Sequence, residues 1–267
     1  MDDINGNVDY LLEVMNIALD GSDLVSREAY RQAHRYQAKG ERDFSLEVDG
    51  DIEQSIKAIL MSADSSIPVL GEESAWTGEA SAERYWVVDP IDGTVNYDRQ
   101  IPLFGTCIAL IENKRPVMAG ISLPILEERF VARRGLGAHL NGEKITIRDG
   151  GRFDGALVGM GDYAVGEGAA EKNKLRFAVT QYLAGRVLRI RMPGSAAIQL
   201  AWLACGRLDA SVTLSNTAWD VQAGVLIAQE AGAEVFDGDG SEHTTASSYT
   251  LASHSDLKEA ILAGIAS

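Results

Sequence analysis

The sequence is poor in the residues that build disulfide frameworks and soft-metal sites. It contains two cysteines and four histidines among 267 residues. Two cysteines do not make a disulfide framework or a thiolate metal site, and Cys107 and Cys205 both stand in apolar runs. We therefore expect both to be buried free thiols. None of the histidines stands near the acidic motifs described below, so none is assigned as a ligand.

Positive charge and long apolar runs are also scarce. The chain has 24 basic and 39 acidic residues, a formal net charge of −15. Nucleic-acid binding depends on clustered Lys and Arg, so nucleic acid is not expected as a partner. No apolar run reaches the ~18 residues needed to span a bilayer. The acidic N-terminus lacks the basic region of a secretory signal. We expect a cytoplasmic protein without a membrane partner.

Motifs of several common enzyme classes are missing. There is no GxxxxGK[ST] phosphate loop, and no plausible Ser-His-Asp or Cys-His arrangement. The Gly-rich stretch GMGDYAVGEG, residues 159–168, has the wrong spacing for a dinucleotide fingerprint. The sequence thus offers no evident nucleotide loop and no evident covalent nucleophile.

Hydrophobic periodicity predicts a mixed α and β architecture. Residues 7–37 and 51–63 carry apolar residues at helical spacing, the first helix with a break near Gly21. The apolar runs before Glu72 and up to Asp89 read as short buried strands. Further strands and helices are predicted after these segments: an antiparallel meander over 105–148, then strands at 156–161, 186–191, 208–213, 233–236 and 249–253, with helices at 167–184, 195–205, 220–231 and 255–265.

A soft boundary is placed at 150–154, within the stretch GGRFDG that begins at residue 150. It divides the chain into an N-terminal α+β subdomain, 1–152, which contains most of the acidic motifs, and a C-terminal α/β subdomain, 153–267. The fold class is therefore expected to be α+β or mixed αβ.

The segment DPIDGT places two carboxylates three positions apart after an apolar run. Pro90 has a fixed φ and no N–H, so we expect the strand to end at Asp89. Gly93 tolerates conformations closed to other residues, so a tight turn can bring Asp92 back beside Asp89. Thr94 stands where a helix could begin, and a helix N-terminus offers N–H groups to phosphate. Acids for a hard cation and amides for an anion, on one turn, indicate a metal and phosphate site.

Two further acidic positions join this motif. Glu72 and Glu73 follow the apolar run PVLG, and Asp220 follows NTAW. Each alone has a structural explanation, because an acid at a strand end is usually solvated and an Asp that begins a helix is commonly its N-cap. Oxygen-only ligands suit Mg²⁺, Mn²⁺ or Ca²⁺ rather than zinc.

Four segments together resemble the inositol monophosphatase family of Mg²⁺-dependent, lithium-sensitive phosphatases. Their order and spacing match the family along nearly the whole chain: LGEES, WVVDPIDGTVNY, GSAAIQLAWLACGRLDA and WDVQAGVLIAQEAGAEV. The resemblance implies a layered αβαβα sandwich of the inositol monophosphatase and fructose-1,6-bisphosphatase type, and a homodimer. It also implies two to three Mg²⁺ ions per active site, for which Mn²⁺ could substitute.

The resemblance further implies a role for each acid. One metal would bind Glu72, Asp89 and the backbone carbonyl of Ile91. A second would bind Asp89, Asp92 and Asp220, so that Asp89 bridges the two. A third, weaker metal near Glu72 would help to activate water.

Catalysis and phosphate binding are implied for neighbouring groups. Thr94 would hydrogen-bond the attacking water and would be held in turn by Asp49, with Glu72 as the third catalytic residue. The amides of Gly93 and Thr94 would bind the phosphate.

Substrate contacts are implied at four pocket positions: Asp162, Ser195, Ala196 and Thr213. Asp162 could equally be a solvated loop acid. Inositol-specific members carry an acid seven residues before the metal-binding Asp of the WD motif, and this chain has Thr213 there. Arg189 and Arg191 could reach an anionic substrate or could pair with surface acids.

The predicted function is that of a phosphoric monoester hydrolase. A Mg²⁺-dependent phosphomonoesterase would hydrolyse a small metabolite phosphate, such as a polyol or sugar phosphate, with metal-activated water. No covalent phosphoenzyme is required, which agrees with the lack of an evident nucleophile. Alternatives within the superfamily are a histidinol-phosphate phosphatase, a fructose-1,6-bisphosphatase, a nucleotide phosphatase or another biosynthetic-pathway phosphatase. A regulatory binding protein with the same fold is the non-enzymatic alternative.

Overall fold

The computed structural model describes residues 2–32, 35–40, 43–74, 76–79 and 82–266. Its helices are α1 (Asp2–Ala29), α2 (Glu47–Ala63), α3 (Thr94–Asp98), α4 (Ala169–Ala184), α5 (Ala196–Ala204), α6 (Ala218–Glu230) and α7 (Ser255–Ile265), with a 3₁₀ turn at Phe153–Gly155. Its strands are β1 (Tyr36–Gly40), β2 (Asp43–Leu46), β3 (Val69–Gly71), β4 (Arg84–Asp92), β5 (Gly105–Glu112), β6 (Arg115–Leu123), β7 (Glu128–Arg133), β8 (Gly137–Leu140), β9 (Glu143–Ile145), β10 (Leu157–Met160), β11 (Arg189–Arg191), β12 (Ala210–Thr213), β13 (Glu234–Phe236) and β14 (Thr250–Ser253).

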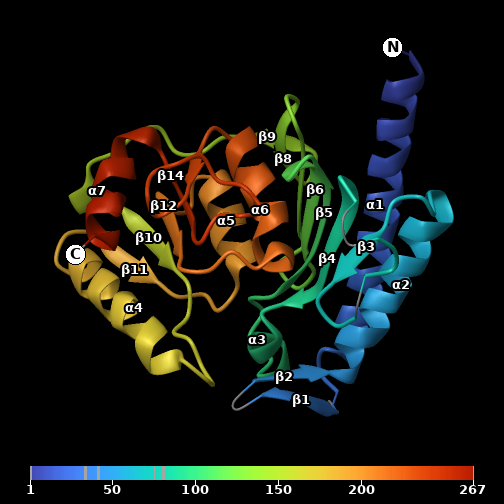
Figure 1. Cartoon of the computed structure of the whole chain (residues 1–267), viewed down its shortest axis with the longest axis horizontal. Helices are drawn as coiled ribbons and strands as arrows, with labels where there is room; N and C mark the ends of the chain where they lie inside the picture. Colours follow the sequence, from blue (N-terminus) through green and yellow to red (C-terminus); the bar gives the residue numbers. More distant parts are fainter. Residues whose placement is uncertain (1, 33–34, 41–42, 75, 80–81, 267) are drawn as a thin grey trace.

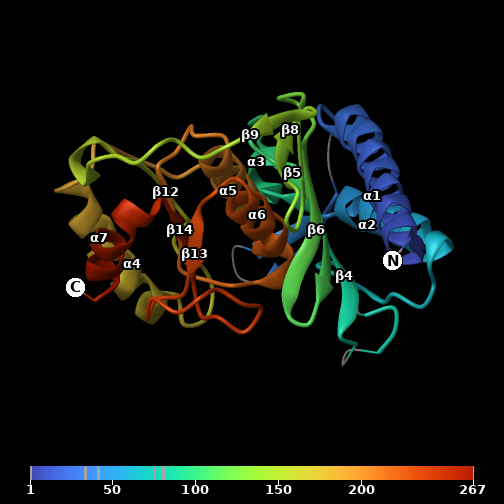
Figure 2. The same ribbon diagram turned by 90° about the horizontal axis from the view of Figure 1, so that it is seen from above.

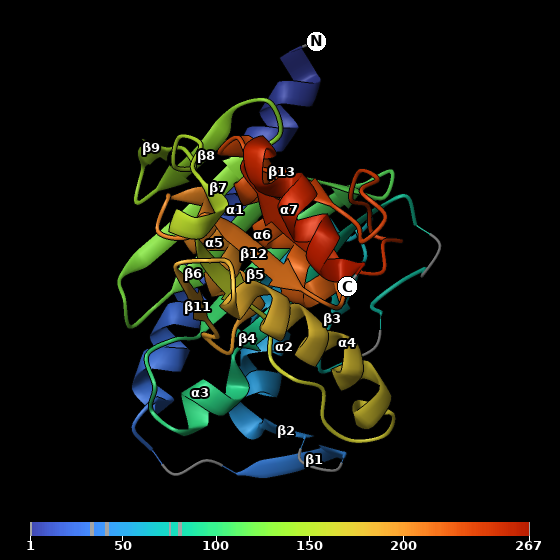
Figure 3. The same ribbon diagram turned by 90° about the vertical axis from the view of Figure 1, so that its left-hand side faces the viewer.

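The elements stack in five layers. A seven-stranded sheet has the order β3-β4-β5-β6-β7-β8-β9, and a five-stranded sheet has the order β11-β10-β12-β14-β13. Helices α1 and α2 cover one face of the larger sheet, and α5 and α6 lie between the two sheets (Figures 1 and 2). Helices α4 and α7 form the outer layer on the smaller sheet, which faces the viewer in Figure 3. This order confirms the predicted αβαβα sandwich.

Alternation along β5 explains why helices cover both faces of the larger sheet. Ile108 and Leu110 pack in the core shared with α1 and α2. Cys107, Ala109 and Ile111 pack in the core shared with α5 and α6. Successive side chains of a strand point to opposite faces, and all five are buried. An unbroken apolar strand is therefore covered on both sides.

The two large sheets come from different parts of the chain. The strands of the seven-stranded sheet lie within 69–145, and those of the five-stranded sheet lie within 157–253. The boundary placed at 150–154 falls between these ranges. The division into two subdomains stays a prediction, and proteolytic cleavage confined to 150–154 would support it.

The first helix is shorter than its periodicity predicted. Helix α1 is continuous through Gly21 but ends at Ala29, and residues 36–40 form β1; residues 33–34 lie outside the described residues. Strand β1 pairs antiparallel with β2, and Tyr36 meets Phe44 edge to face with ring centroids 5.2 Å apart. Pairing in this hairpin overrides the weak local helix preference.

Pro90 does not end its strand, contrary to expectation. Strand β4 continues to Asp92, and its register with β5 shifts between Asp89, opposite Cys107, and Asp92, opposite Gly105. Two residues of β4 thus oppose one of β5, which is a bulge. A bulge needs no N–H from Pro90, so the strand tolerates proline there.

Two smaller expectations concerned the state of the two cysteines and the lack of a membrane-spanning segment. Cys107 and Cys205 are both free, as predicted, but Cys205 is only half-buried. Among the helices that the structure describes, none is both long and apolar enough to cross a membrane.

Candidate active site

The four predicted acidic ligands come together where β3, β4 and α6 meet. Glu72 follows β3 directly, Asp89 and Asp92 lie near the end of β4, and Asp220 lies in the first turn of α6. Strands β3 and β4 are parallel, and the Glu72 N–H donates to the Val88 carbonyl at 3.2 Å. The carboxylates of Glu72, Asp92 and Asp220 all act electrostatically on Asp89. Asp220 is not the N-cap of α6, because that position is Thr217.

Burial and mutual repulsion raise the pKa values of three of these acids. Burial raises the pKa of Asp89 well above its ordinary value, and the charges of Glu72, Asp92 and Asp220 add to this. Burial, with Asp92 and Glu72, raises the pKa of Asp220 to about 8. Burial raises the pKa of Asp92 to about 6, although hydrogen bonds to its carboxylate oppose the shift. Raised pKa values in a cluster of acids indicate that nearby positive charge does not fully compensate the carboxylates.

Two donors at the start of α5 hold Asp92. Its Oδ2 accepts hydrogen bonds from the Ser195 hydroxyl and from the Ala197 N–H, each at 2.6 Å. The Ser195 hydroxyl also accepts the Ile198 N–H at 3.1 Å, so it caps α5. The partial positive charge of a helix N-terminus favours a carboxylate at this place.

Asp49 belongs to the same acidic cluster. It lies in the first turn of α2 and is 1% exposed, and its Oδ2 accepts the Leu46 N–H at 2.6 Å. Its Oδ1 has no partner among the described residues. Burial raises the pKa of Asp49 to about 7; the bond from Leu46 opposes this, whereas Glu73 and Glu72 add to it.

The turn after β4 brings the remaining predicted groups together. Gly93 has φ 97°, a left-handed conformation, and a Cβ there would lie 3.0 Å from the Leu103 carbonyl oxygen. Glycine is therefore required for two independent reasons. The Thr94 hydroxyl donates to the Ile91 carbonyl at 3.1 Å, so two groups predicted for separate roles contact one another.

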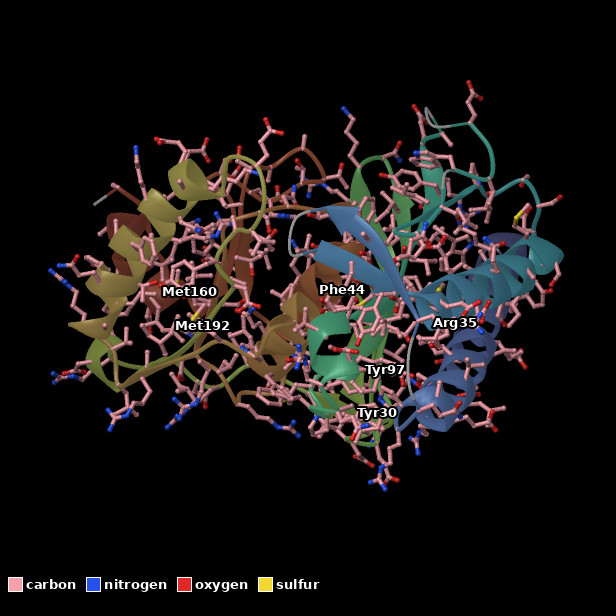
Figure 4. All side chains as sticks on the ribbon, turned by 90° about the horizontal axis from the view of Figure 1, so that it is seen from below. Tyr30, Arg35, Phe44, Tyr97, Met160 and Met192 are labelled. Carbon is pink, nitrogen blue, oxygen red and sulfur yellow. The ribbon has the colours of Figure 1, made fainter. Side chains whose placement is uncertain are left out.

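Aromatic packing holds the short helix α3 beneath this turn. The Tyr97 hydroxyl donates to the Ser26 carbonyl at 2.9 Å, which ties α3 to α1. Its ring lies 4.7 Å from that of Phe104 and 5.6 Å from that of Tyr30, centroid to centroid. Figure 4 shows Tyr30 and Tyr97 next to each other at α3. The turn that carries Gly93 and Thr94 therefore rests on a buried base.

Lys39 is a residue of this site that the sequence analysis missed. Its Nζ lies 2.8 Å from Glu72 Oε1 and 2.6 Å from Glu73 Oε1. Burial lowers the pKa of Lys39, but the bonds to the two glutamates raise it more, so the net shift is upward. No local signal marks a lysine in an exposed hairpin, because only the fold brings β1 to Glu72.

A buried ion pair supports the segment after β3. Glu53 and Lys57 of α2 are both buried, with Nζ 3.1 Å from Oε1. Glu53 Oε2 accepts the Glu73 N–H at 2.7 Å, and Oε1 accepts the Ser74 hydroxyl at 2.5 Å. A Cβ on Gly71 would lie 2.3 Å from the Glu53 carboxyl carbon, so only glycine leaves room for this arrangement.

A cavity of about 210 Å³ opens beside Asp92 and Asp220. All four residues predicted to contact substrate line it, namely Asp162, Ser195, Ala196 and Thr213. Arg176 of α4 and Gln199 of α5 also line it, and the sequence analysis missed both. Arg189 and Arg191 are exposed, and neither lines this cavity.

The donor set suits a hard divalent cation. The donors are oxygen atoms, and Asp89 Oδ1 has no partner among the described residues although the side chain is 1% exposed. A divalent cation would relieve the repulsion that raises the pKa values of Asp89, Asp92 and Asp220. In the described part of the chain, no group of three or more Asp, Glu, His or Cys side chains is placed so that it could hold a metal ion in this conformation. The ammonium group of Lys39 is the cation beside Glu72.

Comparison with known proteins identifies the family of the chain. The sequence profile of the inositol monophosphatase family matches residues 8–267. The chain is 32% identical over 260 residues to Nus factor SuhB of Pseudomonas aeruginosa, covering 94% of this chain and 95% of that protein. It is 33% identical over 266 residues to inositol monophosphatase 3 of Solanum lycopersicum, covering 97% of each.

A solved structure is similar over the same extent. Inositol monophosphatase from Anabaena (Nostoc) sp. PCC 7120 superposes with a TM-score of 0.85 at 27% identity, covering 97% of this chain and 96% of that one. The layered fold, the acidic cluster and the full-length match lead to one conclusion. The chain belongs to the inositol monophosphatase family and is a phosphoric monoester hydrolase.

Proposed function

We propose that this phosphatase is Mg²⁺-dependent and hydrolyses a phosphate ester of a small polyol, sugar or related metabolite. The observation that carries the proposal is the Asp89 carboxylate, which is buried among three further acids and has one oxygen without a partner among the described residues. Glu72, Asp89 and the Ile91 carbonyl would hold one ion, and Asp89, Asp92 and Asp220 a second. Bound there, Mg²⁺ would neutralise the ester, lower the pKa of the attacking water and stabilise the leaving alkoxide.

The chain's own groups would position the reactants. Asp49 Oδ1 has no described partner and can accept a hydrogen bond. We assign to it, with Glu72 and the Thr94 hydroxyl, the task of holding the attacking water. The N–H groups of Gly93 and Thr94 would donate to phosphate oxygens. Fixing water and phosphate in line supplies much of the rate enhancement in phosphoryl transfer.

The proposal also covers how many metal ions bind and which metal can replace Mg²⁺. We propose two to three Mg²⁺ ions per site, the third near Glu72, with Mn²⁺ as a working substitute. Lys39 bridges Glu72 and Glu73 in this structure. A metal on Glu72 would therefore compete with the Lys39 ammonium for the same carboxylate.

Two further parts of the proposal concern the assembly and location of the protein. We propose a cytoplasmic homodimer. Tyr10, Ile17 and Leu24 are exposed and stand seven residues apart on α1, so they form an apolar stripe that a second copy could cover. Light scattering on the purified protein would test the dimer, and a monomer at all concentrations would contradict it.

The experiment that tests the function is a hydrolysis screen with Mg²⁺ and with EDTA. The panel contains inositol 1-phosphate, histidinol phosphate, fructose 1,6-bisphosphate, sugar phosphates and nucleoside monophosphates. We expect Mg²⁺-dependent phosphate release from at least one ester and none with EDTA. The relative named as a Nus factor makes a regulatory protein the second candidate. Failure to turn over any ester with Mg²⁺ or Mn²⁺ would favour that candidate instead.

A further inference from the structure

We infer that the leaving group of the substrate carries a second anionic group, a phosphate or a carboxylate, which Arg176 binds in the cavity beside Asp92 and Asp220. The inference rests on the proposed function, because it names the class of ester hydrolysed at that site.

Arg176 is the cationic residue among those that line the cavity. Three backbone carbonyls fix its guanidinium: Nε donates to Asp162 at 3.1 Å, Nη2 to Leu214 at 3.1 Å, and Nη1 to Lys172 at 3.3 Å. Within the described residues no carboxylate forms an ion pair with it. Carbonyl groups orient the charge but do not neutralise it, so a half-buried cation is left facing the cavity without a counter-ion.

The guanidinium has donors left for a ligand. It carries five N–H groups, and the three carbonyl contacts use three of them. Two N–H groups in a rigid fork match the two oxygens of a carboxylate or phosphate. The fork is held in place before any ligand arrives, so little side-chain freedom is lost on binding.

Two uncharged groups in the same cavity also lack partners. Thr213 Oγ1 and Gln199 Oε1 have none among the described residues, and their side chains are 6% and 1% exposed. A buried polar atom without a partner is costly, so a ligand hydroxyl group that reached either atom would be bound favourably. The cavity is therefore lined by one cationic side chain and by two polar side chains that each have an oxygen without a described partner.

The charge at position 213 agrees with this assignment. Thr213 is neutral, so no carboxylate at this position repels an anionic leaving group or pairs with Arg176. The remaining acid that lines the cavity away from the metal cluster is Asp162, and its backbone carbonyl, not its carboxylate, accepts the bond from Arg176. The preferred ester is thus a polyhydroxylated compound with one anionic substituent besides the scissile phosphate.

The test uses two pairs of esters that differ by one anionic group. They are 2-phosphoglycerate against glycerol 2-phosphate for a carboxylate, and fructose 1,6-bisphosphate against fructose 1-phosphate for a second phosphate. We expect the wild type to favour the more anionic ester of at least one pair by about 10- to 100-fold in kcat/KM. Arg176→Met should lose most of that preference through KM, whereas Arg186→Met, which removes an exposed arginine outside the cavity, should keep it.

The variants separate binding from support of the fold. A merely structural role for Arg176 would lower turnover of both esters of a pair equally and leave their ratio unchanged. Arg176→Lys keeps the charge but not the planar fork, so it should retain part of the preference and also serves if Arg176→Met does not fold. The pair of esters whose kcat/KM ratio changes in Arg176→Met identifies the bound anion as a carboxylate or a phosphate.

Two results would overturn the inference, in distinguishable ways. An unchanged ratio in Arg176→Met, with normal Mg²⁺-dependent turnover, would overturn this inference alone and leave the proposed function standing. No turnover of any of the four esters by the wild type would remove the proposed function and this inference with it.

Discussion

The carboxylate of Asp92, at the end of β4, accepts a hydrogen bond of 2.6 Å from the Ser195 hydroxyl at the start of α5. The two residues are 103 positions apart in the chain. Their contact joins the end of β4 in the larger sheet to the central helical layer. It brings an acid from the first half of the chain to a cavity whose other walls come from the second half.

Replacement of Asp89 should abolish most of the activity. Asp89→Asn removes the charge that we assign to both metal ions, so kcat should fall by at least ~10³. Circular dichroism should show an unchanged fold. The control is Asp154→Asn, which alters an exposed acid paired with Arg152 and should leave kcat near that of the wild type. Near-normal turnover by folded Asp89→Asn would contradict the assignment.

Lithium should inhibit at millimolar concentrations. The resemblance to the family implies that this small cation would bind at Asp92 and Asp220 once product phosphate is bound. Initial rates are measured at saturating Mg²⁺ with LiCl, and with NaCl at the same ionic strength as the control. Equal rates in the two salts would count against lithium sensitivity.

The buried carboxylate of Glu53 should support both the fold and metal binding. Glu53→Gln removes the charge that faces Lys57 in the core, and breaking a buried pair costs about 3–5 kcal/mol of unfolding free energy. Because Glu53 also holds the Glu73 N–H beside Glu72, more Mg²⁺ should be needed for half-maximal activity.

A surface pair provides the matched control for Glu53. Glu112 pairs with Arg84 at 2.8 Å with both side chains over a third exposed, so Glu112→Gln should cost less than ~1 kcal/mol. The double variant Glu53→Gln/Lys57→Met should recover part of the lost stability. Urea unfolding measures all three, and similar losses for Glu53→Gln and Glu112→Gln would refute the structural role of Glu53.

His243 should make the protein less stable in mild acid. Burial lowers its pKa to about 4, and its Nε2 lies 3.0 Å from Asn216 Oδ1. The folded state therefore binds a proton less readily than the unfolded chain, whose histidine titrates near 6.5. The contribution of His243 to the unfolding free energy is therefore complete above pH ~6.5. It is lost as the pH falls toward 4, and the total loss is roughly 3 kcal/mol.

The measurement is the difference in unfolding free energy between variant and wild type across pH 4 to about 7. His243→Gln should flatten the dependence in this window, because the uncharged amide does not titrate. His139→Gln, on β8, is the control and should keep the slope of the wild type. If the unfolding free energy of His243→Gln still depends on pH as in the wild type, other groups cause that dependence.

A carboxylate at position 213 should change the substrate preference. Thr213→Glu could accept hydroxyl hydrogens of a polyol ring and would repel an anionic leaving group. We expect kcat/KM for inositol 1-phosphate to rise by about 10- to 100-fold. The preference for more anionic esters should fall. Thr213→Ser keeps a neutral hydroxyl and should behave as the wild type. An unchanged ranking in Thr213→Glu would mean that position 213 does not select the substrate.

The sequence by itself determined a mixed α and β fold and marked the acids that cluster, whereas the order of the layers was implied only by the resemblance to the family. The apolar run 107–111 within β5 and the periodic faces of α2 required cover on specific sides, because strand and helix periods are local properties of the chain. Glu72, Asp89, Asp92 and Asp220 were recognisable because buried strand and helix ends concentrate acids in short motifs. Local pattern placed the end of α1 too late, because residues 36–40 pair with β2 as a strand. It also ended β4 too early at Pro90, because pairing with β5 continues to Asp92.

Only the tertiary structure decided which distant side chains complete the site. Lys39 lies 33 residues from Glu72 along the chain, and Arg176 lies 38 residues from the Leu214 carbonyl that orients it. Nothing in their neighbouring residues distinguishes them from surface cations. Their roles depend on the hairpin reaching β3 and on α4 lying beside β12. Contacts of this kind are set by the packing of whole elements, whereas periodicity and motif spacing record only what lies nearby in the chain.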